Sequence, residues 1–390
     1  MTANPYIKQY LMTAGPTPVP PAVTQAMAAP MLYHRAPAFD ELYARVLGRL
    51  PAVFATANPV LAFTASGSGA LESAVANLVR PGTRALALAA GKFGERWIGL
   101  CEAYGADLIT HQPGWGARID PAGVDRVLER EGHIDVVFGT LSETSTGIVH
   151  DIQAIAEVVR RHDALLVVDA VSGLGAARML QDEWGVDVVV AGSQKALMTP
   201  PGLAFASVSE RALEAARALP GGRYYFDWAR TAKSQAQGAS PFTPAVSLFL
   251  GLDAALGLIE QEGLENVWAR HELLARAARA GVLGLGLELF GDPDERSSVV
   301  TALELPGDVD GGRVPGILRR LGITANGGQD GLKGRILRIA HCGYFGAFDI
   351  LTSLSGLELA LDQLGHDVDH GAGVGAAQRV FAEAGVLAAA

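Results

Sequence analysis

The stretch Val188–Gly202, VVVAGSQKALMTPPG, places a single lysine shortly after an apolar run. A continuous apolar run of this length is typical of a strand that is covered on both faces of a sheet. Lys195 follows the run after a turn of small residues, and Pro200 and Pro201 then stiffen the next turn. In the ordinary alternative, such a lysine only extends its side chain from the strand end to water.

A second charged residue ends another apolar run. Asp169 closes the strand-like part of LLVVDAVSG, at Leu165–Gly173. In open α/β sheets, ligands bind at the carboxyl ends of the strands. The sequence therefore predicts that Lys195 and Asp169 point into the same crevice.

The alternation of short apolar runs with helical stretches predicts an α/β fold, with a large domain built on a mostly parallel sheet and a smaller C-terminal α+β domain. Expected strands of the large domain are Val60–Ala65, Arg84–Ala89, Ile134–Gly139, Ala164–Asp169, Val186–Ala191 and Leu203–Val208. Its expected helices are Ala22–Ala28, Ala38–Leu50, Ala70–Leu78, Gly94–Tyr104, Pro121–Glu131, Ile152–His162 and Ala245–Gln261. The smaller domain should contain helices Leu264–Ala280, Gly312–Leu321 and Phe348–Leu364, and strands Leu287–Phe290, Ser298–Leu305 and Arg335–Ala340. We therefore expect an N-terminal arm (1–20), a large domain (21–262), a small domain (263–365) and a tail without an assigned role (366–390).

The composition excludes several classes of protein. The 390 residues carry a formal net charge of −10 without a Lys/Arg cluster, which argues against a nucleic-acid partner. The two cysteines, Cys101 and Cys342, are too few for a disulfide framework or a cysteine-based metal site, and we expect no metal. The N-terminus lacks the pattern of a signal peptide, and no apolar run is long enough to span a membrane. A cytoplasmic protein is expected.

A lysine, a carboxylate and a helix start are the groups that pyridoxal phosphate requires. Its aldehyde forms a Schiff base with a lysine, its ring nitrogen is held protonated by a carboxylate, and its phosphate binds N–H groups at a helix start. TASGSGALESA, at Thr64–Ala74, supplies a strand end, a Gly/Ser turn and a helix start. A dinucleotide-binding fold is the alternative, but Glu72 replaces the third glycine of its fingerprint. That alternative would also leave Lys195 and Asp169 unexplained.

Several motifs together resemble the class V aminotransferases, and within them the serine–pyruvate/alanine–glyoxylate group. These motifs are TAGPTPVP (Thr13–Pro20), SGSG (Ser66–Gly69), ETSTG (Glu143–Gly147), DAVS (Asp169–Ser172), SQK (Ser193–Lys195), YYFDW (Tyr224–Trp228), PFTPAVSL (Pro241–Leu248) and GRILRIAHCGYF (Gly334–Phe345). The resemblance covers roughly residues 10–364. It implies the type I, aspartate aminotransferase-like fold of pyridoxal-phosphate enzymes, and a homodimer.

The resemblance also implies roles for individual residues. Lys195 would bind the cofactor covalently and move a proton, and Asp169 would hold the pyridinium nitrogen. Phe93 and Val171 would contact the two faces of the ring, and Thr144 would face its phenolic oxygen. The phosphate would be held by Ser68, Gly69, Ala70 and Gln194, and by Thr243 of the second subunit. Arg338 would grip the α-carboxylate of the substrate in a pocket lined by Ala14 and Gly15, while His34 and Arg35 are either site residues or ordinary interface charges.

Simpler explanations stay open for several of these residues. Ser68 and Thr243 could cap helices, Phe93 could be a core aromatic residue, and Arg338 could form a surface ion pair.

The expected reaction is a ping-pong transamination between a small amino acid, with serine or alanine favoured, and glyoxylate or pyruvate. An aspartate or 2-aminoethylphosphonate aminotransferase would share the fold and differ only in the pocket. A class V desulfurase or lyase is disfavoured, because such enzymes usually carry histidine where Gln194 stands. A non-catalytic relative is disfavoured by the presence of Lys195, Asp169 and Arg338 together.

Overall fold

The computed structural model describes residues 6–385, so 1–5 of the expected arm and 386–390 of the expected tail lie outside the described part. Its larger sheet has seven strands in the order β2-β10-β9-β8-β5-β3-β4. Their bounds are β2 Val60–Phe63, β3 Arg84–Leu88, β4 Asp107–His111, β5 Val136–Thr140, β8 Leu165–Asp169, β9 Val188–Gly192 and β10 Ala204–Val208. Strands β4, β3, β5, β8 and β9 are parallel, and β10 runs antiparallel to both β9 and β2. The predicted mostly parallel sheet is confirmed.

One strand of this sheet, the edge strand β4, was not predicted from the sequence. Its residues, DLITH, are all exposed or half-buried, so they carry none of the continuous apolar signal of the central strands. In contrast, β5, β8, β9 and β10 are buried at every position.

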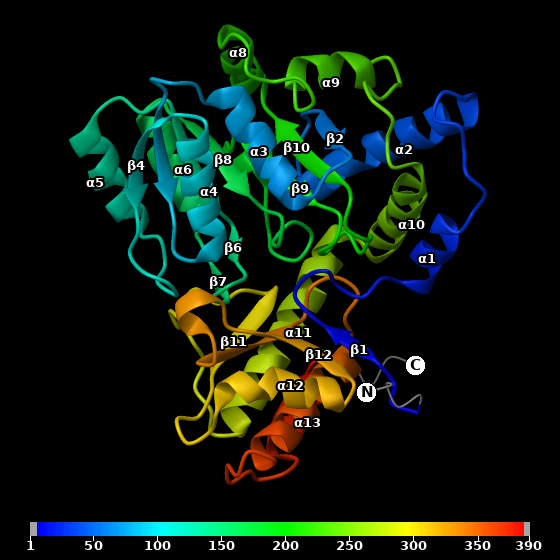
Figure 1. Cartoon of the computed structure of the whole chain (residues 1–390), viewed down its shortest axis with the longest axis vertical. Helices are drawn as coiled ribbons and strands as arrows, with labels where there is room; N and C mark the ends of the chain where they lie inside the picture. The colour runs from blue at the N-terminus through cyan, green and yellow to red at the C-terminus, as the bar shows by residue number, and fades with distance from the viewer. Residues whose placement is uncertain (1–5, 386–390) are drawn as a thin grey trace.

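Helices cover both faces of the larger sheet (Figure 1). Alternate residues of β5 show the two cores: Val136 and Phe138 face one core, and Val137 faces the other. The first core also takes side chains from α3 (Gly67–Leu78), α4 (Lys92–Ala103), α8 (Glu210–Ala218) and α9 (Trp228–Gln235). The second takes side chains from α2 (Pro37–Phe54), α5 (Pro121–Glu131), α6 (Ile152–Arg161), α7 (Gln181–Trp184) and α10 (Val246–Glu262), while α1 (Pro21–Met27) lies against α10.

A second sheet of four strands, in the order β1-β12-β13-β11, forms the core of the C-terminal part. Its strands are β1 Tyr10–Met12, β12 Ile323–Gly327, β13 Ile336–Ala340 and β11 Val300–Glu304. Helices α11 (Leu264–Gly284), α12 (Val314–Arg320) and α13 (Ala347–Asp362) accompany it, with short 3₁₀ turns at Gly311–Arg313 and Asp330–Leu332. The N-terminal arm therefore joins the C-terminal sheet, because β1 pairs in parallel with β12 (Figure 1).

Two expectations for the C-terminal part change in detail. The expected strand Leu287–Phe290 is wrong: only an isolated bridge joins Leu289 to Leu303. The described part of the tail forms the helix α14 (Ala372–Glu383), which lies against α11 and α13 and buries Phe381. The Glu358 carboxylate accepts the N–H groups of Gly371 and Val374 at the start of that helix, at 3.0 and 3.3 Å. The domain boundaries expected from the sequence stay a proposal.

Among residues 6–385 no helix is both long and apolar enough to cross a bilayer. In the same range, no group of three or more His, Cys, Asp or Glu side chains is arranged to hold a metal ion.

Candidate active site

A cavity of about 300 Å³ lies at the carboxyl ends of β8 and β9. Asp169 is the last residue of β8, and Lys195 lies in the turn that follows β9. The cavity brings together these of the predicted residues: Gly15, Ser68, Phe93, Asp169, Val171, Gln194 and Lys195. It also includes Arg96 and Ser172, to which the sequence analysis assigned no role.

Lys195 is buried, and it does not reach water as the ordinary alternative proposed. Its Nζ donates a hydrogen bond of 2.6 Å to the carbonyl oxygen of Ala14. Burial lowers the pKa of the Lys195 ammonium. A buried amine that loses its proton more readily is a better nucleophile and base.

Gly15 is required by the close approach of Lys195. Its φ is +137°, and a Cβ at this position would lie 2.3–2.5 Å from the side chain of Lys195. The arm is also joined to the lysine turn by Thr17, whose N–H and hydroxyl donate to the carbonyls of Gln194 and Lys195, each at 3.1 Å. The N-terminal arm thus forms one wall of the cavity.

Asp169 is buried with only one of its two carboxylate oxygens occupied. Oδ1 accepts the N–H of Val171 at 2.8 Å, and no described residue donates to Oδ2. Burial raises the pKa of Asp169 to about 6, and the charges of Arg96 and Lys195 only partly oppose this rise. A buried carboxylate in this state is stabilised by a cationic N–H donor placed in the cavity.

The start of α3 supplies N–H groups to the lining of the same cavity. The N–H groups of Gly69 and Ala70 already donate to the carbonyl of Ser66, at 2.8 and 3.2 Å. Ala70 is fully buried and does not line the cavity. Among the described residues, the helix-start donors without an acceptor are therefore the N–H groups of Gly67 and Ser68, rather than those of Gly69 and Ala70.

These unsatisfied groups fit pyridoxal phosphate. Asp169 Oδ2 can accept from a pyridinium N–H, and the N–H groups of Gly67 and Ser68 can donate to a phosphate. Gln194 also lines the cavity; its buried side-chain oxygen has no described partner but is an acceptor, so only its side-chain NH₂ can donate to a phosphate. Gly67 keeps this end of the cavity narrow, because a Cβ there would lie 2.9 Å from Val171.

Phe93 lies at the start of α4, on the cavity wall, with its ring centroid 6.0 Å from Lys195 Nζ. A buried carboxylate, Glu143, fixes this helix start by accepting the N–H groups of Phe93 and Gly94 at 3.0 and 2.9 Å. Glu143 also accepts from the hydroxyl and the N–H of Ser145. Burial raises the pKa of Glu143, although each of these hydrogen bonds favours its charged form. The motif ETSTG contains Glu143, but nothing in the sequence indicates that this side chain contacts the start of α4.

Arg338 lies on β13, next to the cavity but outside its lining. It is buried, and it donates from Nη1 to the carbonyl of Thr144 at 2.9 Å and from Nε to the carbonyl of Gly327 at 3.0 Å. No described carboxylate forms an ion pair with it, so the surface ion pair considered for this residue is absent within residues 6–385. Burial lowers the pKa of Arg338 to about 10. Thr144 does not line the cavity either. Its hydroxyl is hydrogen-bonded, at 2.7 Å, to the hydroxyl of Ser172, and Ser172 does line the cavity.

Thr243 lies outside the cavity of its own chain. It is exposed, and it lines a separate surface hollow together with Met31, Tyr33 and His34. Met31 and Tyr33 are 71 % and 65 % exposed, which leaves an apolar patch beside Thr243. Arg35 is exposed close to the same hollow.

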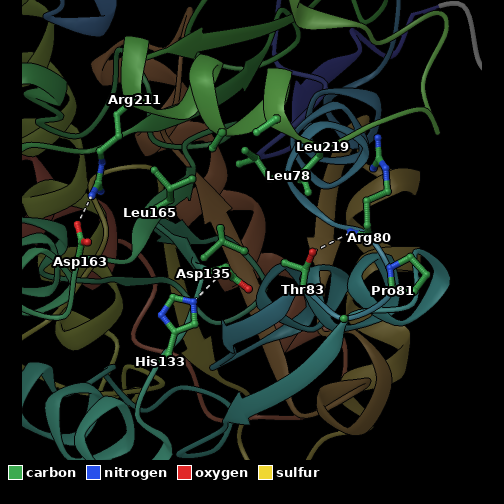
Figure 2. A pocket seen from close by; sticks show the side chains of 14 residues that line it. Leu78, Arg80, Pro81, Thr83, His133, Asp135, Asp163, Leu165, Arg211 and Leu219 are labelled. Atoms are coloured by element: carbon green, nitrogen blue, oxygen red, sulfur yellow. Dashed lines mark hydrogen bonds and ion pairs between the residues drawn. The ribbon is translucent and has the colours of Figure 1, made fainter.

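Another hollow, of about 590 Å³ and so larger than the cavity around Lys195, lies at the amino-terminal ends of β3, β5 and β8, on the other edge of the sheet (Figure 2). Its polar groups already have partners: Arg211 pairs with Asp163 at 3.3 Å, and His133 pairs with Asp135 at 3.0 Å. The smaller cavity is therefore the better candidate, since its charged groups lack such partners.

Comparison with known proteins agrees with this geometry. Residues 9–337 match the family model described as Aminotransferase class-V. The chain is 40 % identical to the soluble hydrogenase small subunit of Synechococcus sp., over 97 % of this chain and 99 % of that protein. It is 35 % identical to the L-aspartate–glyoxylate aminotransferase of Paracoccus denitrificans (94 % of both chains) and 34 % identical to the serine–glyoxylate aminotransferase of Methylorubrum extorquens (96 % of both).

The crystal structure of pyridoxamine–pyruvate aminotransferase from Mesorhizobium loti superposes with a TM-score of 0.93 at 31 % identity, covering 98 % of this chain and 100 % of that one. The fold is thus the type I fold of pyridoxal-phosphate enzymes. The chain belongs to the class V aminotransferases, a family that depends on pyridoxal phosphate.

Proposed function

We propose that this aminotransferase moves the amino group of a small amino acid, serine or alanine, to glyoxylate or pyruvate in two successive half-reactions. The observation that carries this proposal is the buried guanidinium of Arg338, which has no described carboxylate partner. Its charge acts on Lys195, since it lowers the pKa of that amine. A buried guanidinium with free N–H donors favours binding of a substrate carboxylate and fixes its orientation.

Pyridoxal phosphate, when bound, supplies the electron sink for the reaction. Lys195 Nζ would be the base that takes the proton from the substrate Cα and passes it to the cofactor, and in the second half-reaction would carry it the other way, because burial favours the neutral form of this amine. Asp169 would accept a hydrogen bond from the ring nitrogen of the cofactor and so stabilise the positive charge on that nitrogen. Phe93 and Val171 line the cavity and would contact the cofactor ring.

Serine and alanine are favoured as donors because motifs such as ETSTG and SQK resemble those of the serine–pyruvate/alanine–glyoxylate group. The name of the Methylorubrum relative, serine–glyoxylate aminotransferase, supports serine as donor and glyoxylate as acceptor. The name of the Paracoccus relative supports aspartate as the second candidate. Aspartate would bring a second carboxylate, and 2-aminoethylphosphonate would bring a phosphonate to the same guanidinium.

A desulfurase remains the weaker alternative. Such a reaction needs a cysteine thiolate that can attack, and the nearest candidate is Cys342. Burial raises the pKa of its thiol to about 12, and its Sγ lies 3.8 Å from the carbonyl of Ser172. Cys342 is therefore a packed thiol and a poor nucleophile.

The test is the visible absorption spectrum of the purified full-length protein. Serine, alanine, aspartate and 2-aminoethylphosphonate are added one at a time, and the donor that removes the cofactor's visible band is a substrate of the first half-reaction. We expect serine and alanine to act, and Arg338→Met to keep the band but lose the response to both. A protein whose band no donor changes, or a variant that responds like the wild type, would overturn the proposal.

We also propose that the protein acts in the cytoplasm as a homodimer, in which Thr243 of one subunit reaches the phosphate site of the other. The exposed position of Thr243 outside its own cavity, beside Met31 and Tyr33, supports this arrangement. A mixed dimer of Lys195→Ala and Thr243→Glu subunits tests it. If Thr243 acts across the interface, the mixed dimer contains one intact site and recovers about half of the wild-type activity. If Thr243 acts within its own chain, no intact site forms.

A further inference from the structure

The cavity contains a second cationic side chain, Arg96, for which the proposed reaction has no role. Lys195 and Arg96 are the lysine and arginine side chains that line the cavity. Arg96 forms no ion pair with any carboxylate among residues 6–385. Its described partners are the hydroxyl of Ser68, 3.1 Å from Nη1, and the ring of Phe93, whose centroid is 5.0 Å from Cζ. A guanidinium with no carboxylate partner beside a cavity is a candidate anion-binding group.

Arg96 lies at the phosphate end of the cavity. Ser68 is the second residue of α3, so the contact with its hydroxyl brings the guanidinium to the helix start. The N–H groups of Gly67 and Ser68 have no acceptor at this point among the described residues. A helix start and a guanidinium at one place form a stronger anion site than either does alone.

The side chain is held in this position from its own helix. Arg96 follows Phe93 by one turn of α4, and the two side chains stack. The Glu143 carboxylate accepts N–H groups at the start of α4 and so fixes the part of the helix that carries Phe93 and Arg96. The side chain lines the cavity, and its positive charge opposes the rise in the pKa of Asp169 and adds to the lowering of the pKa of Lys195, both of which burial dominates.

A cationic side chain at this place would stabilise a bound cofactor phosphate. The phosphate group is a dianion, and the chain as a whole carries a formal net charge of −10. The phosphate residues expected from the sequence were Ser68, Gly69, Ala70, Gln194 and Thr243, none of which is cationic. The helix start contributes only about half a positive charge.

We propose that Arg96 binds the phosphate of pyridoxal phosphate, together with the N–H groups of Gly67 and Ser68, and so completes the anion site at the start of α3. The guanidinium would exchange its contact with the Ser68 hydroxyl for phosphate oxygens, or share it with them. This inference rests on the cofactor of the family and not on the proposed substrates, so its failure would leave the choice of amino donor unaffected.

The test compares two ligands that differ only in the phosphate. Full-length protein freed of cofactor is titrated with pyridoxal phosphate and with pyridoxal, and binding is followed by the visible band. For Arg96→Met we expect binding of pyridoxal phosphate to weaken about ten- to a hundredfold, the range for a hydrogen bond to a charged group, and binding of pyridoxal to change less than about threefold. The affinity of Arg96→Lys for pyridoxal phosphate should lie between that of Arg96→Met and that of the wild type. Lys92→Met is the matched control. Lys92 lies on the same helix, but its ammonium pairs with Asp330 outside the cavity, so its loss should change the binding of neither ligand.

An equal loss for both ligands would overturn the proposal and assign Arg96 to support of the Phe93 ring. Unchanged binding of pyridoxal phosphate would overturn it as well.

A second measurement uses the wild-type protein and does not depend on folding of a variant. Phenylglyoxal should modify Arg96 in the cofactor-free protein and in the presence of pyridoxal, while inorganic phosphate or pyridoxal phosphate should protect it, as read by mass spectrometry of the peptide. Modification that phosphate does not slow would contradict the proposal.

Discussion

Replacing Asp169 by asparagine should stabilise the cofactor-free protein while it inactivates the enzyme. The carboxylate is buried, only one oxygen has a described donor, and burial raises its pKa from 3.8 to about 6. The folded protein therefore binds the proton of Asp169 more tightly than the unfolded chain does. The stability from this group is fully present below about pH 3.8 and is lost as the pH rises through about 6.

The magnitude follows from the pKa shift. A shift of about two units means that the ionised carboxylate costs about 3 kcal/mol of stability above pH 6. Asparagine keeps the acceptor for the N–H of Val171, but its amide NH₂ lacks a described partner and costs about 1 kcal/mol. The net gain at pH 8 is about 2 kcal/mol. For a chain of 390 residues this corresponds to a rise in Tm of about 2–3 °C.

The assay is thermal unfolding of the cofactor-free wild type and of Asp169→Asn at pH 5 and pH 8. We expect the variant to unfold at the higher temperature at pH 8 and to keep only a small part of that advantage at pH 5, because about half of the cost of the ionised carboxylate is still present there. Asp187→Asn is the matched control: this buried carboxylate is paired with Arg211 at 2.7 Å, so its loss should destabilise the protein by about 2 kcal/mol at pH 8. The reasoning is refuted if Asp169→Asn unfolds at a lower temperature than the wild type at pH 8, or if its advantage is equal at both pH values. With pyridoxal phosphate added, only the wild type should gain its full stabilisation.

Three further changes have outcomes that the structure predicts. Arg338→Lys should raise KM for amino-acid donors at least about tenfold, because a single ammonium cannot reproduce a two-point contact with a carboxylate. Steady-state kinetics measure this change, and an unchanged KM would show that Arg338 is only structural. Glu143→Gln should lower the free energy of unfolding by about 2–4 kcal/mol, since an uncharged amide leaves one of the N–H groups of Phe93, Gly94 or Ser145 without an acceptor, and urea denaturation measures this loss. Phe381→Ala should cost about 3 kcal/mol and expose α14 to limited proteolysis, and a helix no more susceptible than in the wild type would show that its packing on α11 and α13 does not hold it.

The sequence by itself determined the class of fold and the presence of Lys195 and Asp169 in one cavity. Strands buried on both faces appear as continuous Val, Ile, Leu and Ala runs, which is why the central strands were predictable and the polar edge strand β4 was not. Lys195 and Asp169 could be paired from the sequence because each follows a buried strand, and the carboxyl ends of parallel strands share one edge of the sheet.

Only the tertiary structure decided how these groups are held. Glu143 and Arg96 are ordinary charged residues in the sequence, and they gain a role only because α4 packs across the start of α3 and over the ETSTG turn. The arm joins the C-terminal sheet through β1 and places Gly15 against Lys195, a contact between residues 180 positions apart in the chain. Local sequence patterns record which residues are buried along one element. They do not record which element lies opposite, because that choice depends on packing between segments that are distant in sequence.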